Sequence, residues 1–273
     1  MDYLSALLRG GAAALVVVAL LLAAQRWGRG LAGLLAGLPT VTGPAMVWLA
    51  LDRGSDFAEQ ASHGAIAAAV PCALFGLIYA RLSLTCGRLA TLLWACAACL
   101  SALSLLSHWS APMHLTLALV AVTCAVCLAS MPRVLPRALQ HPVGPRRHAM
   151  VLRAGVMTVL TAGVVTALAS LSAQALGPQW AGVMTSLPLL AAAVVLVLHR
   201  EGCAVQVQDF LRGYTAGLVG RSVFVAVFGA LLATRGLALA LATALAVALT
   251  LGWGTLAWMQ WRGRLAILWG TNR

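Results

Sequence analysis

Apolar runs of about 20 residues follow one another along almost the whole chain. A helix of this length spans the ~30 Å hydrocarbon core of a bilayer. Charged residues make up 9% of the sequence, whereas a soluble domain contains about a quarter, so the chain has too few charges for a water-exposed surface. Ten-residue segments of alternating polarity, which are typical of membrane β-barrels, do not occur in the sequence. The sequence therefore predicts an all-α polytopic membrane protein whose main partner is the lipid bilayer.

We predict about nine transmembrane helices from these runs. Arginine supplies all 18 basic residues, and the net charge is +12. Because arginine gathers in cytoplasmic loops, we predict that the N-terminus is outside and the C-terminus inside, an arrangement that leaves only Arg9, Arg53 and Arg235 in outer segments. This bias favours an integral multi-pass protein of the bacterial cytoplasmic (inner) membrane. No basic segment is interleaved with aromatic residues, so we expect no binding to nucleic acid. The predicted spans are residues 4–24, 31–51, 58–80, 88–107, 113–131, 150–171, 180–198, 209–232 and 237–260.

The two halves of the chain resemble each other. The stretch "AGLLAGLP" at 32–39 matches "AGVMTSLP" at 181–188. Further along, "DFAEQASHG" at 56–64 matches "DFLRGYTAG" at 209–217. These matches predict two four-helix repeats, and the single central helix between them inverts the second repeat, as in many secondary transporters. The predicted domains are 1–110, the first four-helix repeat; 111–148, the linker helix and a basic cytoplasmic connection; and 149–273, the second inverted repeat and a basic tail.

The first matched pair of stretches ends in Leu-Pro inside a predicted span. Proline removes a backbone donor and clashes with the preceding turn, and glycine lets the backbone unwind. In lipid, the freed carbonyl groups need a partner from protein, water or a ligand. The alternative is an ordinary proline kink that packs on a neighbouring helix through Gly33 and Gly37. We predict two interrupted helices that face a polar cavity, with the candidate substrate-binding residues Pro39, Thr40, Thr42, Gly43, Pro44, Thr185, Ser186 and Pro188.

Arg221 lies twelve residues after Asp209, about 18 Å along a helix, and therefore near mid-membrane. An arginine at this depth costs roughly 2.5 kcal/mol or more and usually faces a cavity or a partner. One interpretation is contact with an anionic ligand, because guanidinium binds carboxylate or phosphate through two parallel hydrogen bonds. The other is a structural arginine that caps the exposed carbonyl groups of a broken helix. No acidic residue is predicted near mid-membrane, so the interior favours an anion over a cation.

Two other groups of residues are candidates for chemistry. Glu59 and His63 are four residues apart on one predicted helix face and form a candidate titrating pair. Two CxxC pairs, "CAAC" at 96–99 and "CAVC" at 124–127, lie at similar predicted depth and could hold zinc or an iron–sulfur cluster. Apolar residues flank both pairs, however, and cysteine is a common small apolar residue in helices. We therefore expect no metal and no cofactor.

Three functional classes are open at this stage. The leading hypothesis is a secondary transporter or exporter of a small anionic or amphipathic solute, or of a lipid headgroup, by alternating access of the two repeats. The second is a non-catalytic subunit of a membrane complex, and the third is a membrane metal or redox enzyme that uses the CxxC pairs. The sequence contains no recognisable catalytic constellation, so we do not expect an enzyme. Its glycine-rich helix faces could form a homodimer as readily as they could pack within one chain.

Overall fold

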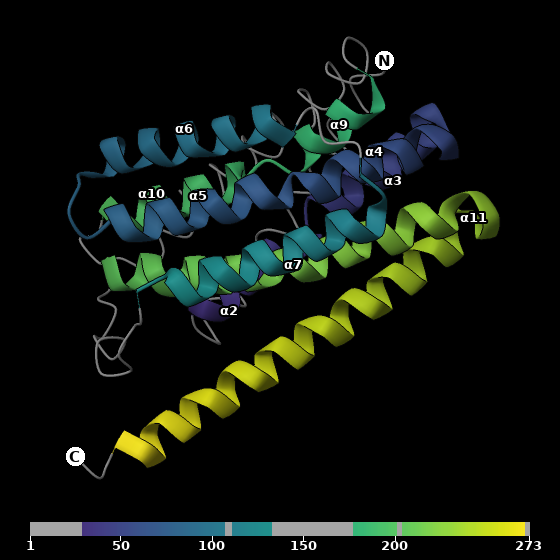
Figure 1. Cartoon of the computed structure of the whole chain (residues 1–273). Coiled ribbons are helices and arrows are strands. Elements are labelled where there is room, and N and C mark those ends of the chain that lie inside the picture. Colours follow the sequence, from purple (N-terminus) through teal and green to yellow (C-terminus); the bar gives the residue numbers. More distant parts are fainter. Residues whose placement is uncertain (1–28, 107–110, 133–176, 201–203, 271–273) are drawn as a thin grey trace.

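The computed structural model describes residues 29–106, 111–132, 177–200 and 204–270 (Figure 1), and the regular secondary structure of these residues is entirely α-helical. The predicted spans 4–24 and 150–171 lie outside the described residues. The helices are α2 (Arg29–Gly37), α3 (Thr42–Arg53), α4 (Ser55–Ala67), α5 (Ala69–Leu82), α6 (Arg88–Leu106), α7 (Met113–Ser130), α9 (Pro178–Thr185), α10 (Leu189–Arg200) and α11 (Ala204–Gly270).

The outer surface of the bundle is strongly apolar. Six helical segments of the described residues are long and apolar enough to cross a membrane. Helix α6 turns large side chains outward, with Leu93 70%, Trp94 65% and Leu105 78% exposed. Water would solvate such a surface poorly, whereas lipid tails solvate it well. The all-α prediction is confirmed, and these segments agree with the predicted multi-pass architecture.

The six segments differ from the nine predicted spans for two reasons. Two predicted spans fall outside the described residues. In addition, the predicted span 209–232 and most of the predicted span 237–260 fall within one segment, Ala204–Thr255. This 52-residue segment is far longer than one crossing requires, and it bends sharply at Gly236, where the backbone leaves the helical conformation. The number nine therefore stays a prediction.

Several of the turns between helices lie at two opposite ends of the bundle (Figure 1). At one end, on the right in Figure 1, lie the α3–α4 turn at Gly54 and the bend at Gly236. At the other end, Arg81 donates two hydrogen bonds to the carbonyl oxygen of Ser130, at 3.2 and 3.0 Å. Arg212 donates to the carbonyl oxygens that follow α7, at 3.1 Å each. The arginines predicted to be cytoplasmic thus hold together one end of the bundle.

Helix α2 crosses the first part of α11 with the two backbones in direct contact. A Cβ atom on Gly33 would overlap the carbonyl oxygen of Phe210 and lie 2.9 Å from the amide nitrogen of Tyr214. In return, a Cβ atom on Gly213 would overlap the carbonyl oxygen of Gly30. Only glycine permits this approach, which is how membrane helices without a hydrophobic driving force gain close packing.

Helix α9 crosses α4 in the same way. A Cβ atom on Gly182 would overlap the carbonyl oxygen of Ala61, and one on Gly64 would overlap the carbonyl oxygen of Gln179. Gly33 and Gly182 are 149 residues apart, and so are Gly64 and Gly213. The two crossings therefore use glycines at equivalent spacing along the chain.

Replacing Gly236 by alanine should destabilise the bend within α11. Gly236 has φ 76° and ψ 168°, a region that L residues enter at a cost of about 1–3 kcal/mol. We expect Gly236→Ala to lower the midpoint of thermal unfolding in detergent. The matched control is Gly254→Ala in the same helix, because a Cβ atom there meets nothing within 4 Å and alanine favours a helix over glycine. Equal midpoints for the two variants would contradict the assigned bend.

Candidate functional site

Both predicted interruptions are present in the structure. Helix α2 ends at Gly37 and α3 begins at Thr42, on either side of Pro39. Helix α9 ends at Thr185 and α10 begins at Leu189, directly after Pro188. The carbonyl oxygens of the two prolines accept the first hydrogen bonds of the helices that follow, from Gly43 and Ala192, at 2.8 Å each. Each proline therefore ends one half-helix and starts the next.

The two interruptions meet each other inside the bundle. Thr42, at the start of α3, donates its hydroxyl hydrogen to the carbonyl oxygen of Thr185 at 3.2 Å. The next carbonyl oxygen, that of Ser186, accepts hydrogen bonds from the Cys72 thiol and from Nη1 of Arg221, each at 3.1 Å. Helices α3, α5 and α11 thus satisfy the carbonyl groups that the end of α9 leaves free.

Arg221 is buried at this meeting point with an exposed fraction of 4%, and it is the one buried charged side chain among the described residues. Its Nη1 atom caps the broken helix, as one of the two sequence interpretations expected. Its Nε and Nη2 atoms, however, find no hydrogen-bond partner in the described part of the chain. A buried, charged donor without a partner is energetically costly, so capping alone does not account for this arginine.

Two neutral donors beside Arg221 are also unsatisfied among the described residues. The hydroxyl groups of Tyr214 and Ser186 are buried and have no oxygen or nitrogen partner there. The Cys72 sulfur lies close enough to both Tyr214 and Arg221 to be a hydrogen-bond partner for each. Its own hydrogen points to the Ser186 carbonyl oxygen, and sulfur is a weak acceptor. We call Cys72, Ser186, Tyr214 and Arg221 the central cluster.

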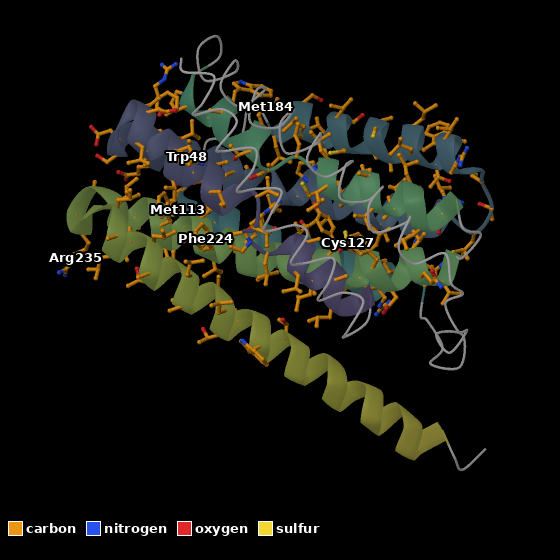
Figure 2. The ribbon with its side chains drawn as sticks, turned by 180° about the vertical axis from the view of Figure 1, so that it is seen from behind. Trp48, Met113, Cys127, Met184, Phe224 and Arg235 are labelled. Carbon is orange, nitrogen blue, oxygen red and sulfur yellow. The ribbon has the colours of Figure 1, made fainter. Side chains whose placement is uncertain are left out.

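The predicted site residues divide into two groups. Thr42, Thr185, Ser186 and Arg221 come together as described above, with Pro39 and Pro188 shaping the backbone around them. The predicted residues Thr40, Gly43 and Pro44 contribute differently. The Thr40 hydroxyl turns back toward the carbonyl oxygen of Leu38 at 3.5 Å, and Gly43 packs against the ring of Phe224. Phe224 is labelled near the middle of the bundle in Figure 2.

Glu59 and His63 do not join the central cluster in any described contact. Both lie on α4, where His63 is exposed and Glu59 is half-buried. This position is near the end of the bundle that carries the Gly54 turn, because α4 begins at Ser55. The predicted titrating pair therefore lies on a helix that packs against α9 but outside the central cluster, and its proton chemistry stays a prediction.

The four cysteines of the CxxC pairs do not assemble into a metal site. Among the described residues, no group of three or more His, Cys, Asp or Glu side chains is placed to hold a metal ion. All four of these cysteines are described, and each is a free thiol. Cys99, Cys124 and Cys127 are buried among apolar side chains of the core. The metal or redox alternative stays a prediction for which the described residues supply no group of three metal ligands.

Sequence reasoning missed Tyr214 and Cys72. Tyr214 precedes Arg221 by seven residues, or two helical turns, so helical periodicity alone places the two residues on the same face. Cys72 precedes Arg221 by 149 residues, the spacing that also relates the glycine crossings. The match of 32–39 with 181–188 has this spacing, but the match of 56–64 with 209–217 has a spacing of 153, so the sequence alone did not pair Cys72 with Arg221.

Replacing Thr42 by valine should loosen the contact between the two interruptions. The change keeps the side-chain shape but removes the donor to the Thr185 carbonyl oxygen, at a cost of about 1 kcal/mol. We expect a lower midpoint of thermal unfolding than for Thr250→Val. Thr250 is the matched control because its exposed hydroxyl bonds only within its own helix, to Val247. Indistinguishable midpoints would show that this contact contributes nothing.

Comparison with known proteins finds no match for this chain among family models, curated proteins or solved structures.

Proposed function

We propose that the protein is a secondary transporter or exporter of a small anionic or amphipathic solute, in a bacterial cytoplasmic membrane. The observation that carries this proposal is Arg221, a buried cation where two interrupted helices meet, with two nitrogen atoms that have no oxygen or nitrogen partner among the described residues. Intramembrane arginine usually faces a ligand path or a partner. Transporters commonly place their substrate where discontinuous helices meet near the membrane midplane.

The electrostatics of this meeting point favour an anion. Helices α3 and α10 begin there and α2 and α9 end there, so the positive and negative ends of their dipoles offset each other and the charge of Arg221 decides the sign. The four described acidic residues lie toward the helix ends instead: Asp52 and Asp56 flank the Gly54 turn, Glu59 lies early in α4, and Asp209 lies beside Gly30. A cationic solute would therefore meet repulsion at the meeting point, whereas an anion would satisfy the unpaired donors.

The spacing of the contacts supports two inverted repeats. Gly33 and Gly182, Pro39 and Pro188, and Gly64 and Gly213 are all 149 residues apart. The Asp-Phe match aligns residues 153 apart, which is four residues, or about one helical turn, more than 149. The contacts therefore support an alignment of the two halves at 149 residues in this part of the repeat.

The two glycine crossings also join opposite units. Helix α2 of the first unit packs on α11 of the second, and α9 of the second packs on α4 of the first. In an inverted repeat, two equivalent interfaces of this kind allow one to open while the other closes. That exchange would expose the central cluster first to one side of the membrane and then to the other.

Counterflow in proteoliposomes tests this function. Vesicles containing the purified protein are preloaded with unlabelled propionate or phosphate, and entry of the same labelled anion is followed, with choline as the cationic control. If the protein is an anion carrier, the labelled anion should enter preloaded vesicles faster than empty vesicles. Labelled choline should enter both kinds of vesicle at the same rate. Absence of any anion counterflow, together with a second chain that stays bound through purification, would contradict the proposal and support a complex subunit.

A further inference from the structure

The arrangement of the donors in the central cluster that have no partner among the described residues indicates the shape of the ligand as well as the sign of its charge. The guanidinium group has one side edge formed by Nε and Nη2, and this is the edge left unpaired once Nη1 donates to Ser186. Two parallel N–H groups on a rigid plane match the two oxygen atoms of a planar anion.

The neutral donors fit the same ligand. A carboxylate has two oxygen atoms with about four lone-pair sites. The side edge of Arg221 would occupy two of these sites, and the buried hydroxyl groups of Tyr214 and Ser186 are available for the other two. Tyr214 lies on the same face of α11 as Arg221, two turns away.

The charge at the site limits the ligand to one negative charge. Arg221 is the one buried charge among the described residues. A monoanion would be neutralised there, whereas a dianion such as hydrogen phosphate would leave one buried charge without compensation, which is costly in an apolar interior. The described carboxylates lie toward the helix ends, near the Gly54 turn or beside Gly30, so the positive group of a zwitterion would lie far from them.

We propose that the central cluster binds a monocarboxylate, held by the Nε–Nη2 edge of Arg221 with the Tyr214 hydroxyl as a further donor. This inference rests on the proposed transport function and names its substrate class. Arg221 is 4% exposed and Tyr214 is 2% exposed, so the structure represents a closed state that the carboxylate enters only after the helices move.

Ligand-dependent stability tests the substrate class. The midpoint of thermal unfolding of the purified protein is measured with propionate, phosphate, glycine and choline at equal ionic strength, with chloride as the salt control. We expect stabilisation by propionate alone, since a ligand that binds only the folded state raises stability by mass action. Tyr214→Phe removes one hydroxyl and keeps the ring, and should weaken propionate binding roughly three- to tenfold. Arg221→Lys keeps the positive charge but loses the planar guanidinium edge, and should weaken propionate binding roughly tenfold or more.

The outcomes separate this inference from the proposed function. If phosphate stabilises the protein more than propionate does, and this effect is lost in Arg221→Lys, the monocarboxylate assignment is wrong. The proposal of anion transport would remain. Equal stabilisation by glycine and propionate would also overturn it, because a zwitterion would then be accepted. If no anion stabilises the protein and counterflow is absent too, both the inference and the proposed function fail.

Discussion

The variant Arg221→Gln is expected to lose anion uptake by roughly a hundredfold or more while remaining as stable as the wild type. The loss follows because hydrogen bonds to a charged group contribute about 1.5–3 kcal/mol each, and the Nε–Nη2 edge would make two of them. Stability should hold because glutamine can still donate to the Ser186 carbonyl oxygen, and because the variant no longer buries an unpaired cation.

The comparison of uptake with stability distinguishes the two roles of Arg221. If the arginine only caps the broken helix, Arg221→Gln should leave the uptake per folded molecule almost unchanged, because glutamine can take over the cap. The matched control is Arg235→Gln, because Arg235 is exposed beside the bend of α11, far from the centre of the bundle (Figure 2). Uptake should be normal in the control, and saturable uptake at the wild-type rate in Arg221→Gln would remove this residue from the site.

Single alanine substitutions at the two glycine crossings are expected to produce the largest losses of stability in the chain. At Gly33 and at Gly182, a Cβ atom would overlap a backbone carbonyl oxygen of the facing helix, so the helices must separate. Forcing an extra methyl group into a packed contact costs about 1–3 kcal/mol and occasionally more. The expected result is a clearly lower midpoint of thermal unfolding in detergent, or no recoverable folded protein.

Gly87 supplies a matched control for these substitutions. A Cβ atom at Gly87 meets nothing within 4 Å, and its backbone does not adopt the left-handed conformation. Gly87→Ala should therefore unfold at the wild-type temperature. If Gly33→Ala and Gly182→Ala behave like Gly87→Ala, the close backbone crossings are wrong, and with them the spacing of 149 residues that supports the repeat.

Local chemistry allowed parts of this structure to be predicted from the sequence. Pro39 and Pro188 interrupt their helices because proline lacks a donor and clashes with the preceding turn, whatever surrounds it. Arg221 could be placed deep in the bundle by counting helical rise from Asp209. Both predictions depend on residues close together in the chain, and both agree with the described helices and burial.

The features that depend on lateral packing could not be predicted in this way. The sequence did not show that Cys72 shares the Ser186 carbonyl oxygen with Arg221, or that the Thr40 hydroxyl turns away from the meeting point. Equal depth of the CxxC pairs left a shared metal site open as an alternative, but depth alone does not place the sulfur atoms, because the rotation of α6 and α7 about their own axes decides where they point. Such rotations are set by contacts between helices distant in sequence.

The most direct test of alternating access is the reactivity of Cys72 from the two sides of the membrane. Cys72 is fully buried in the central cluster, so a membrane-impermeant maleimide should reach it only when the protein opens. The experiment uses a variant in which Cys72 is kept and alanine replaces all the remaining cysteines. The variant is reconstituted into vesicles so that each side of the membrane can be treated separately. We predict slow labelling from both sides, reduced by propionate. Labelling from one side only, or from neither side, would contradict alternating access at the central cluster.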